Sequence, residues 1–319
     1  MKLSIIIPAY NEAPNLGPLY ERLRRVWEEE PADWELLLVD DGSTDGTYEE
    51  ALRLNARDPR VQAISFSRNF GHQMALTAGL DLADGDAVIV MDADLQHPPE
   101  LITDFVKRWK EGYDIVYTVR ASTEDASWSK RITSALFYRI FKRLSGFAIN
   151  VNAADFRLLD RKVVLSFRGI RERVRFLRGL TSWVGYRSTA VPYHAGKRQS
   201  GQSKYSLRRM VSFAVDGLTS FSAAPLHMAV YLGFGLAVVG FLYSAYALYA
   251  RFLSHTAISG WTSLIMVSLI IGGVQLIVLG IIGIYIGKLY DEVKQRPLYL
   301  VQKSTSSLKT KIHEPKLAY

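Results

Sequence analysis

The chain has 319 residues, a formal net charge of +8 and no cysteine, which excludes a disulfide framework, a thiol nucleophile and a cysteine-ligated metal site. The charge is unevenly distributed: residues 1–119 carry a net charge of −11, residues 120–210 carry +15 and residues 211–319 carry +4. The middle region is therefore a concentrated basic surface, suited to a polyanion or to an anionic membrane face.

The first 119 residues alternate apolar, strand-like segments with helical patterns. LSIII, WELLLVD, VQAISF, AVIVMD and DIVYTV are nearly continuous apolar runs, and helices are expected over about 15–30, from Thr47, over 72–82 and from Pro98. Such strands separated by helices predict a mostly parallel α/β sheet covered by helices on both faces. Right-handed crossovers place the loops that follow the strands along one edge, where ligands bind in sheets of this kind.

Acidic residues collect in the loops of that edge. They are Glu12 beside Asn11 after the first strand, Asp40, Asp41 and Asp45 after the second, and Asp92 and Asp94 after the fourth. Carboxylates crowded together repel one another, and a divalent cation removes the conflict. Mg²⁺ typically takes one or two carboxylates and fills its other positions with phosphate oxygens and water. The strand that ends at Asp92 and Asp94 therefore predicts a metal seat for a diphosphate, although an isolated Asp-x-Asp is also typical of a solvated turn.

Two basic segments mix arginine with large apolar residues at helical spacing. They are RGIRERVRFLRGL at 168–180 and YSLRRMVSFAVDGLTSF at 205–221. Both are interpreted as amphipathic helices on a membrane surface, and the alternative is a helix docked on the protein.

Two long uncharged stretches follow. Between Asp216 and Arg251 lie 34 residues without Asp, Glu, Lys or Arg, and 36 more lie between Arg251 and Lys288. Because a helix needs about 20 apolar residues to cross a bilayer, each stretch predicts a membrane span, the alternative being a buried core helix. Lysine and arginine flank the outer ends of the pair, so both chain termini are expected in the cytoplasm.

The motifs SIIIPAYNE, LLLVDDGSTDGT, RNFGH, MDADLQHPPE and NAADFRLLD occur in that order. In order and spacing they resemble the inverting family 2 glycosyltransferases with a GT-A fold. The subgroup that the chain resembles makes polyprenyl-phosphate sugars and includes relatives of dolichol-phosphate mannose synthase and bacterial undecaprenyl-phosphate glucosyltransferases. The resemblance covers nearly the whole chain, including the paired C-terminal helices.

The resemblance implies a nucleotide-sugar pocket with a metal ion, Mg²⁺ or Mn²⁺. Asp94 corresponds to the principal metal ligand, with Asp92 near the metal or the ribose. Asp40 and Asp41 correspond to contacts with base and ribose, although an Asp-Gly-Ser turn with a helix cap explains Asp41 as well. The implied nucleotide-sugar-binding set is Pro8, Tyr10, Asn11, Glu12, Asp40, Asp41, Asp92 and Gln96. His97 is interpreted as a helix-entry residue, because Pro98 and Pro99 fix the turn there.

Asp155, within NAADFRLLD, corresponds to the residue that this family places at the reacting centre. Relatives often have Ser-Gly where this chain has Ala154 and Asp155, so the assignment of Asp155 as a base is open. The alternatives are that Asp155 orients the sugar or stabilises positive charge at the anomeric carbon, and that it forms a structural ion pair with Arg157.

The basic region suits a lipid phosphate acceptor, because arginine neutralises a dianion well. RQSGQSKY resembles the Arg-x-x-Gly-x-Ser-Lys loop of the family. The expected lipid-phosphate-binding residues are Arg120, Lys130, Arg131, Ser134, Arg198, Ser203 and Lys204. Arg171, Arg173, Arg175 and Arg178 are interpreted as anchors to anionic headgroups.

These features predict a cytoplasmic catalytic domain and a membrane hairpin in a multi-pass protein of the bacterial inner membrane. The expected boundaries are a GT-A domain at 1–204 (nucleotide-sugar half 1–119, acceptor half 120–204), an interfacial helix at 205–224, a transmembrane hairpin at 225–288 and a cytoplasmic tail at 289–319. Glycines at 280, 283 and 287 could let helices pack closely, and the family resemblance also suggests a homo-oligomer, a dimer or a tetramer. No nucleic acid partner is expected.

The favoured function is transfer of a hexose from a nucleotide diphosphate sugar, UDP-glucose first and GDP-mannose second, to polyprenyl phosphate with inversion. A processive polysaccharide synthase is disfavoured, because Gln-x-x-Arg-Trp and further spans are not found. A membrane scaffold that binds anionic lipid or RNA explains the basic region but leaves the acidic sheet edge without a purpose.

Overall fold

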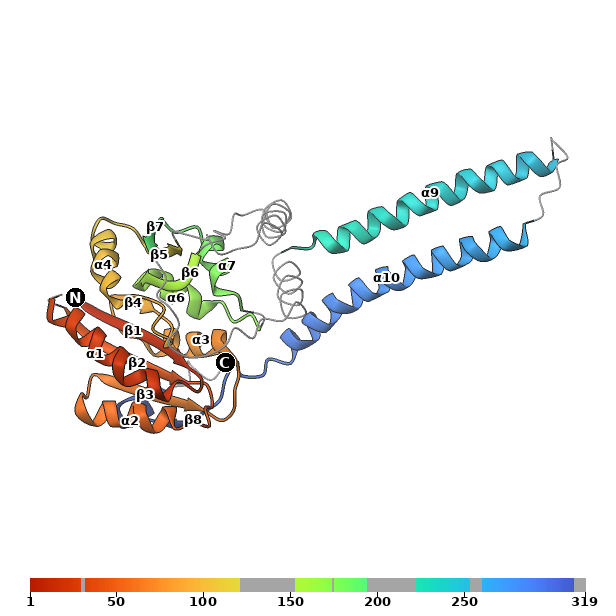
Figure 1. Ribbon diagram of the computed structural model, residues 1–319. Coiled ribbons are helices and arrows are strands. Elements are labelled where there is room, and N and C mark those ends of the chain that lie inside the picture. The colour runs from red at the N-terminus through yellow and green to blue at the C-terminus, as the bar shows by residue number, and fades with distance from the viewer. Residues whose placement is uncertain (30–31, 121–152, 174, 194–221, 253–259, 313–319) are drawn as a thin grey trace. The chain divides into compact units, whose positions relative to one another are not determined.

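The computed structural model describes residues 1–29, 32–120, 153–173, 175–193, 222–252 and 260–312 (Figure 1). The chain divides into two compact units, Met1–Tyr205 with Gln295–Tyr319, and Ser206–Lys294. The first unit is an α/β fold and the second contains two long helices.

The strands described in the first unit form one sheet in the order β7-β5-β6-β4-β1-β2-β3-β8. Their bounds are β1 Lys2–Ala9, β2 Asp33–Asp40, β3 Val61–Phe66, β4 Ala87–Val90, β5 Ile115–Arg120, β6 Ala153–Asp160, β7 Ser188–Tyr193 and β8 Val301–Ser304. β4, β1, β2 and β3 are parallel, as the apolar runs predict. β6 runs antiparallel to β4 and β5, and β8 runs antiparallel to β3.

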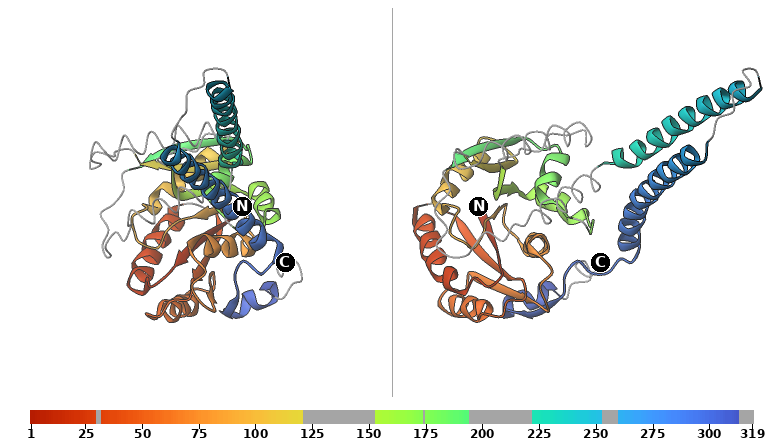
Figure 2. Two further views of the ribbon diagram at one scale, coloured as in Figure 1. Left: turned by 90° about the vertical axis from the view of Figure 1, so that its right-hand side faces the viewer. Right: turned by 45° about the vertical axis from the view of Figure 1, so that its right-hand side comes forward.

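Helices cover both faces of this sheet (Figure 2). They are α1 Ala13–Glu29, α2 Thr47–Arg57, α3 His72–Leu82, η1 Pro99–Leu101, α4 Ile102–Lys110, α6 Arg161–Gly169, α7 Leu177–Trp183 and α11 Ser306–Ile312. Apolar side chains of α1, α2 and α4 form the main core with one face of the central strands. α3 packs closely on β1: a Cβ added at Gly79 would lie 2.2 Å from a methyl carbon of Ile6. The predicted α/β fold with both faces covered is confirmed.

The C-terminal segment, expected as a cytoplasmic tail over 289–319, contributes two elements to the first unit. α10 continues to Val293, and the segment after it supplies β8 and α11 to the first unit. Tyr299 stacks on Phe66 of β3 at 5.1 Å between ring centroids. Its hydroxyl donates to Asp81 Oδ2 at 2.9 Å. β8 has only four residues, too few for an apolar alternation that the sequence could reveal.

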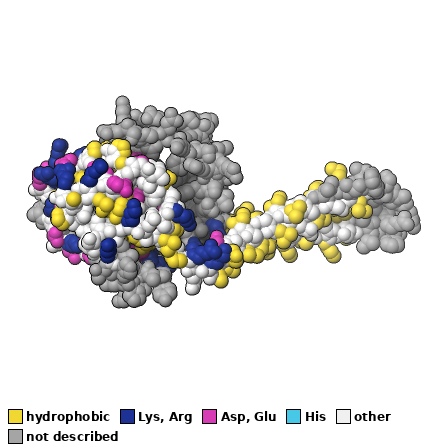
Figure 3. Space-filling view, turned by 90° about the horizontal axis from the view of Figure 1, so that it is seen from below, with side chains coloured by type: hydrophobic (Ala, Val, Ile, Leu, Met, Phe, Trp, Pro, Cys, Tyr) yellow, Lys and Arg dark blue, Asp and Glu magenta, His cyan; other side chains and the backbone are white. Residues whose placement is uncertain are grey.

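The second unit contains α9 Ala224–Phe252 and α10 Trp261–Val293. Within them, Ala224–Tyr246 and Met266–Val293 are long and apolar enough to cross a membrane, by length and composition alone. Their large apolar side chains face outward instead of forming a core: Leu276, for example, is 72% exposed (Figure 3). A buried core helix would show the opposite pattern.

Of the two segments expected to be interfacial helices, only residues 168–180 lie largely within the described part of the chain. Residues 168–180 do not form one helix, because α6 ends at Gly169 and α7 begins only at Leu177. The second segment, 205–221, lies outside the described residues, and so does the beginning of the helix expected over 205–224.

Candidate active site

The loops after β1 and β2 are tied together by hydrogen bonds at the acidic edge. Asn11 has a φ of 57°, in the left-handed region that asparagine tolerates. Its N–H donates to Ser43 Oγ, and its side-chain oxygen accepts from the Thr44 N–H, both at 2.9 Å. Neighbouring Tyr10 is 48% exposed, whereas Pro8 is buried within β1. Asn11 therefore shapes this rim of the edge, and Tyr10 presents its ring to solvent.

Asp40 and Asp41 both accept hydrogen bonds from the protein. Asp40 accepts from the Ser43 N–H at 3.0 Å and from Ser65 Oγ at 2.6 Å. Asp41 accepts from the Phe70 and Gly71 N–H groups at 2.7 and 2.9 Å. Burial raises the pKa of Asp41, although these two backbone donors oppose the rise. The carboxylates thus organise the loops around the expected nucleotide pocket, and a contact with base or ribose stays a prediction.

The Asp-x-Asp segment alternates between the core and the site. Met91, Ala93, Leu95 and His97 are buried, whereas Asp92, Asp94 and Gln96 are half-buried. Asp94 Oδ1 accepts from the Gln96 N–H at 3.1 Å. Leu95 has a φ of 61°, a left-handed conformation that costs a bulky residue about 1–3 kcal/mol and that persists where surrounding packing enforces it. The alternating burial puts the carboxylates of Asp92 and Asp94 on the same, partly exposed side of the segment.

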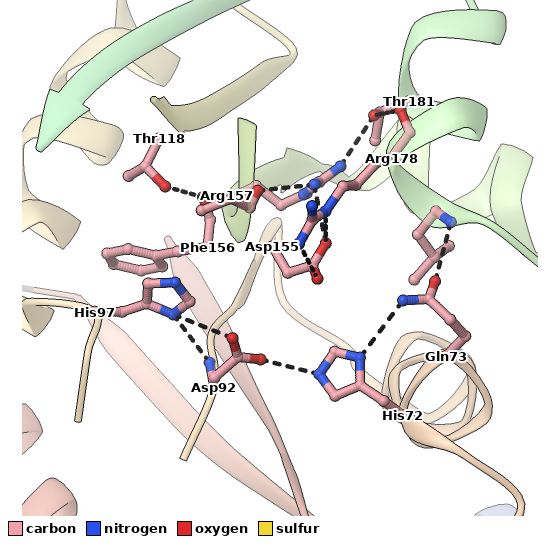
Figure 4. A network of polar contacts seen from close by, with 12 residues as sticks. His72, Gln73, Asp92, His97, Thr118, Asp155, Phe156, Arg157, Arg178 and Thr181 are labelled. Atoms are coloured by element: carbon pink, nitrogen blue, oxygen red, sulfur yellow. Dashed lines mark hydrogen bonds and ion pairs between the residues drawn. The ribbon is translucent and has the colours of Figure 1, made fainter. Parts of the chain in front are cut away.

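Asp92 lies between two histidines (Figure 4). His72 Nε2, at the start of α3, is 2.9 Å from Asp92 Oδ1. His97 Nδ1 accepts from the Asp92 N–H at 3.3 Å and lies 3.7 Å from Oδ2. His97 is only 5% exposed and stacks on Phe156 of β6. His97 thus fixes the end of the β4 segment, which is more than the helix entry expected of it.

The two histidines beside Asp92 have pKa shifts of opposite direction. Burial opposes the charge on Asp92, yet the hydrogen bond with His72 and the nearby imidazoles lower its pKa. Burial also disfavours an imidazolium at His72, but the hydrogen bond and charge of Asp92 raise the pKa of His72 overall. Burial lowers the pKa of His97. The carboxylate therefore interacts mainly with His72.

Acidic crowding is present at this edge. Burial raises the pKa of Glu12, and the charges of Asp94, Asp45 and Asp92 raise it further against a hydrogen bond from Asn15. Among the described residues, no group of three His, Asp or Glu side chains is arranged to hold a metal ion unaided. Mg²⁺ commonly binds one or two carboxylates, and phosphate oxygens and water complete its coordination.

Asp155 of β6 forms ion pairs with two arginines on the other side of the site (Figure 4). Arg178 Nε and Nη2 donate to its two oxygens at 2.8 Å each, and Arg157 Nη2 lies 3.3 Å from Oδ1. Burial opposes the charge, but Arg178 and then Arg157 hold the pKa of Asp155 well below its usual range. Burial lowers the pKa of Arg157 to about 10, which leaves it charged near neutral pH. The ion pair with Arg157 is thus present, alongside a stronger one with Arg178.

The four arginines interpreted as headgroup anchors are engaged within the protein. Arg171 pairs with Asp81 at 2.8 Å, and Arg173 donates to the Arg296 carbonyl. Arg175 is buried and donates to the carbonyls of Ile170 and Phe167. With Arg178 on Asp155, all four guanidinium groups have partners within the fold, and a contact with headgroups stays a prediction.

Most of the expected acceptor residues lie outside the described part of the chain: Lys130, Arg131, Ser134, Arg198, Ser203 and Lys204. Arg120 ends β5, where its backbone pairs with Tyr193 of β7. Sequence reasoning missed His72, Gln73 and Arg178 as members of the site. RNFGH contains His72, but nothing in its spacing indicates that the imidazole reaches Asp92.

A mostly parallel α/β sheet with two aspartates beyond the carboxyl end of a central strand is the architecture of a GT-A glycosyltransferase. Residues 4–166 match the model described as "Glycosyl transferase family 2", and the chain belongs to that family.

Relatives match along nearly the whole chain. An uncharacterized glycosyltransferase of Bacillus subtilis, YkcC, is 45% identical over 304 residues, 95% of this chain and 94% of that protein. A bactoprenol glucosyl transferase of Shigella phage SfII is 39% identical over 304 residues, 95% of this chain and 98% of that protein. Among solved structures, mannosyl-3-phosphoglycerate synthase from Rubrobacter xylanophilus has a TM-score of 0.48 at 18% identity, covering 68% of this chain and 71% of that one.

Proposed function

We propose that the protein transfers a hexose, with inversion, from a nucleotide diphosphate sugar to polyprenyl phosphate, and that the donor is UDP-glucose. The observation that carries the proposal is the 39% identity to a bactoprenol glucosyl transferase over 95% of this chain. That span includes both long apolar helices as well as the family 2 domain. Membership of the family supports the reaction class, and the acceptor follows from the relative.

A divalent cation, Mg²⁺ or Mn²⁺, is part of this proposal. The residues present fit one: Asp94 offers a carboxylate, Asp92 lies two residues away, and burial together with the nearby acids raises the pKa of Glu12. When bound, the cation would neutralise the donor diphosphate and stabilise the leaving nucleoside diphosphate. Asp92 contributes less as a ligand, because His72 already occupies its Oδ1.

Asp155 acts on the sugar as an anion in this proposal. Both of its oxygens accept from Arg178, and its lowered pKa keeps it ionised near neutral pH. A lipid phosphate is also ionised there, so the attacking oxygen needs no general base. The negative charge of Asp155 is suited to orienting the sugar and to stabilising positive charge at the anomeric carbon.

We place the chain in the bacterial inner membrane with α9 and α10 as its two spans and the catalytic unit in the cytoplasm. β8 follows α10 in the chain and pairs with β3, which precedes α9. Both flanks of the helix pair therefore belong to one folded unit, and this supports an even number of membrane crossings. Homo-oligomerisation through the small residues of α10, to a dimer or tetramer, belongs to the same proposal.

The lipid phosphate is proposed to contact the basic residues of the acceptor half. They are Arg120, Lys130, Arg131, Ser134, Arg198, Ser203 and Lys204. The nucleotide sugar is proposed to contact the loops that carry Pro8, Tyr10, Asn11, Glu12, Asp40, Asp41, Asp92 and Gln96.

The experiment that tests the function offers the purified full chain a panel of radiolabelled nucleotide sugars with undecaprenyl phosphate and Mg²⁺ or Mn²⁺. We expect label in the lipid phase with UDP-glucose, none after chelation, and a loss of about a hundredfold or more in Asp94→Asn. Asp104→Asn, an exposed acid on α4, is the matched control and should keep the wild-type rate. Preferred transfer from GDP-mannose would identify GDP-mannose as the donor. Lipid binding without transfer from any nucleotide sugar would favour a membrane scaffold.

A further inference from the structure

One chain of contacts links the two sides of the candidate site (Figure 4). It starts at Asp92 beyond β4, passes to His72 at 2.9 Å, and continues to Gln73, whose Nε2 lies 3.5 Å from His72 Nδ1. Gln73 Oε1 then accepts from the Leu177 N–H at 3.0 Å. Gln73 therefore stands between the Asp-x-Asp segment and α7.

The bond to Leu177 caps α7. The first N–H groups of a helix lack partners within the helix, and the residue before α7, Phe176, makes no side-chain cap hydrogen bond. Gln73 supplies a cap from α3 instead, across 104 residues of sequence. The start of α7 is thereby fixed to the start of α3.

The position of α7 matters because of the residues that it carries. Arg178 follows Leu177 directly and donates hydrogen bonds to both carboxylate oxygens of Asp155. One turn later, Thr181 Oγ1 accepts from Arg157, the second arginine on Asp155. A shift of α7 would therefore move both guanidinium groups that hold Asp155.

The amide of Gln73 is held in one orientation. Only its oxygen can accept from the Leu177 N–H, so its NH₂ group faces His72 Nδ1. That arrangement directs the other nitrogen of His72 toward Asp92. A single amide thus serves both the Asp92 side and the Asp155 side.

We propose that Gln73 is a positioning residue that sets α7, and with it the Arg178–Asp155 pair, relative to the Asp92 segment. This inference rests on the proposed function, in which Asp92 borders the donor and Asp155 faces the reacting sugar. Loss of the cap should misplace Asp155 in the reaction while leaving the nucleotide loops after β1 and β2 intact. The turnover should therefore suffer more than donor binding.

The test compares two variants. Gln73→Met keeps the length of the side chain but loses its hydrogen bonds, whereas Gln73→Glu keeps an acceptor for the Leu177 N–H. We expect kcat of Gln73→Met to fall about five- to tenfold, the effect of one hydrogen bond, with the donor KM within about twofold. Gln73→Glu should recover kcat to within about twofold. Gln62→Met is the matched control, because Gln62 also uses its amide in hydrogen bonds but lies on β3 beside Thr305.

Hydrogen exchange of the same full-length variants in detergent tests the geometry without any substrate. Amides of residues 177–183 should exchange faster in Gln73→Met, at the wild-type rate in Gln73→Glu, and at the wild-type rate in Gln62→Met. The inference would be overturned if hydrogen exchange and kcat were unchanged in Gln73→Met. It would also be overturned if Gln73→Glu did not recover kcat, or if Gln62→Met lost as much kcat as Gln73→Met. If the wild-type chain forms no glycolipid while the exchange pattern holds, the proposed function fails but the positioning of α7 stands.

Discussion

Asp155 keeps a negative charge in a buried position because two arginines surround it. Arg178 donates to both of its oxygens, and the buried Arg157 guanidinium lies 3.3 Å from Oδ1. Removing one partner of a buried ion pair is costly, about 3–5 kcal/mol, because the other charge is left uncompensated. The same contacts that hold Asp155 in place therefore make it a poor proton acceptor.

Asp155→Asn should lower the thermal stability of the detergent-purified chain at neutral pH. The folded-state pKa of Asp155 lies below the unfolded value of about 3.9, so its stabilising effect is present above that pH and is lost as pH falls through lower values. We expect the difference in Tm between wild type and Asp155→Asn to be constant from pH 7 to 5 and to narrow below about pH 4. A difference that widens toward low pH would contradict the ion pair.

Arg178→Lys keeps the positive charge but loses the fork that contacts both oxygens of Asp155. We expect kcat for sugar transfer to fall about tenfold, with the donor KM little changed, because the bidentate contact that is lost is to Asp155 of β6 and not to the loops after β1 and β2. Arg53→Lys, an exposed arginine of α2 paired with Glu50, serves as the control. Equal kcat values for Arg178→Lys and wild type would show that the bidentate contact has no part in the reaction.

At the scale of elements, the loop after β2 depends on a close backbone approach. Gly42 has a φ of 71°, and a Cβ there would lie 2.5 Å from the carbonyl carbon of Arg68. The approach brings the loop that follows β3 within reach of Asp41, whose carboxylate binds the Phe70 and Gly71 N–H groups. Two loops of the expected nucleotide pocket are thus locked together.

Gly42→Ala should raise the donor KM severalfold and lower the Tm, because the added methyl group collides with backbone that cannot move aside. Gly46→Ala is a matched control: Gly46 also has a positive φ, 89°, but nothing lies within 4 Å of an added Cβ. It should cost about 1 kcal/mol of backbone strain and leave the donor KM unchanged. Identical donor KM values in the two variants would argue against a role for this approach in nucleotide binding.

The sequence reveals those elements whose signal is local. The runs that form β1 to β5 are largely apolar because helices cover both faces of the sheet, and Asp92 and Asp94 stand out because charge directly follows such a run. Partners distant in sequence left no such signal. The basic stretch containing Arg171 and Arg178 indicated a membrane surface, yet these two arginines pair with Asp81 and Asp155, which lie 90 and 23 residues earlier in the chain.

At the scale of the whole molecule, the sheet itself constrains the topology. Strand β8 lies on the far side of the helix pair in sequence, yet it completes the edge of β3. With α9 and α10 as membrane spans, as proposed, the segments before α9 and after α10 lie in the same compartment. The absence of native cysteine makes this easy to measure, since an introduced thiol is the only one present.

Single cysteines at Ser307 on α11 and at Ser259 between α9 and α10 should react differently with a membrane-impermeant maleimide. In intact spheroplasts we expect Ser259→Cys to be labelled and Ser307→Cys to be protected until the membrane is opened. A cysteine replacing Leu52 on α2 should behave like Ser307→Cys, because α2 and α11 belong to the same unit. Opposite behaviour of Leu52→Cys and Ser307→Cys would contradict two crossings.

The most direct measurement of the central claim is the anomeric configuration of the lipid product, determined by NMR after incubation with UDP-glucose, undecaprenyl phosphate and Mg²⁺. Because the donor is α-linked and a single displacement inverts the anomeric carbon, we expect a β-linked glucosyl phosphodiester of the lipid. An α-linked glycolipid, or release of free glucose with no glycolipid, would contradict inverting transfer to a lipid phosphate.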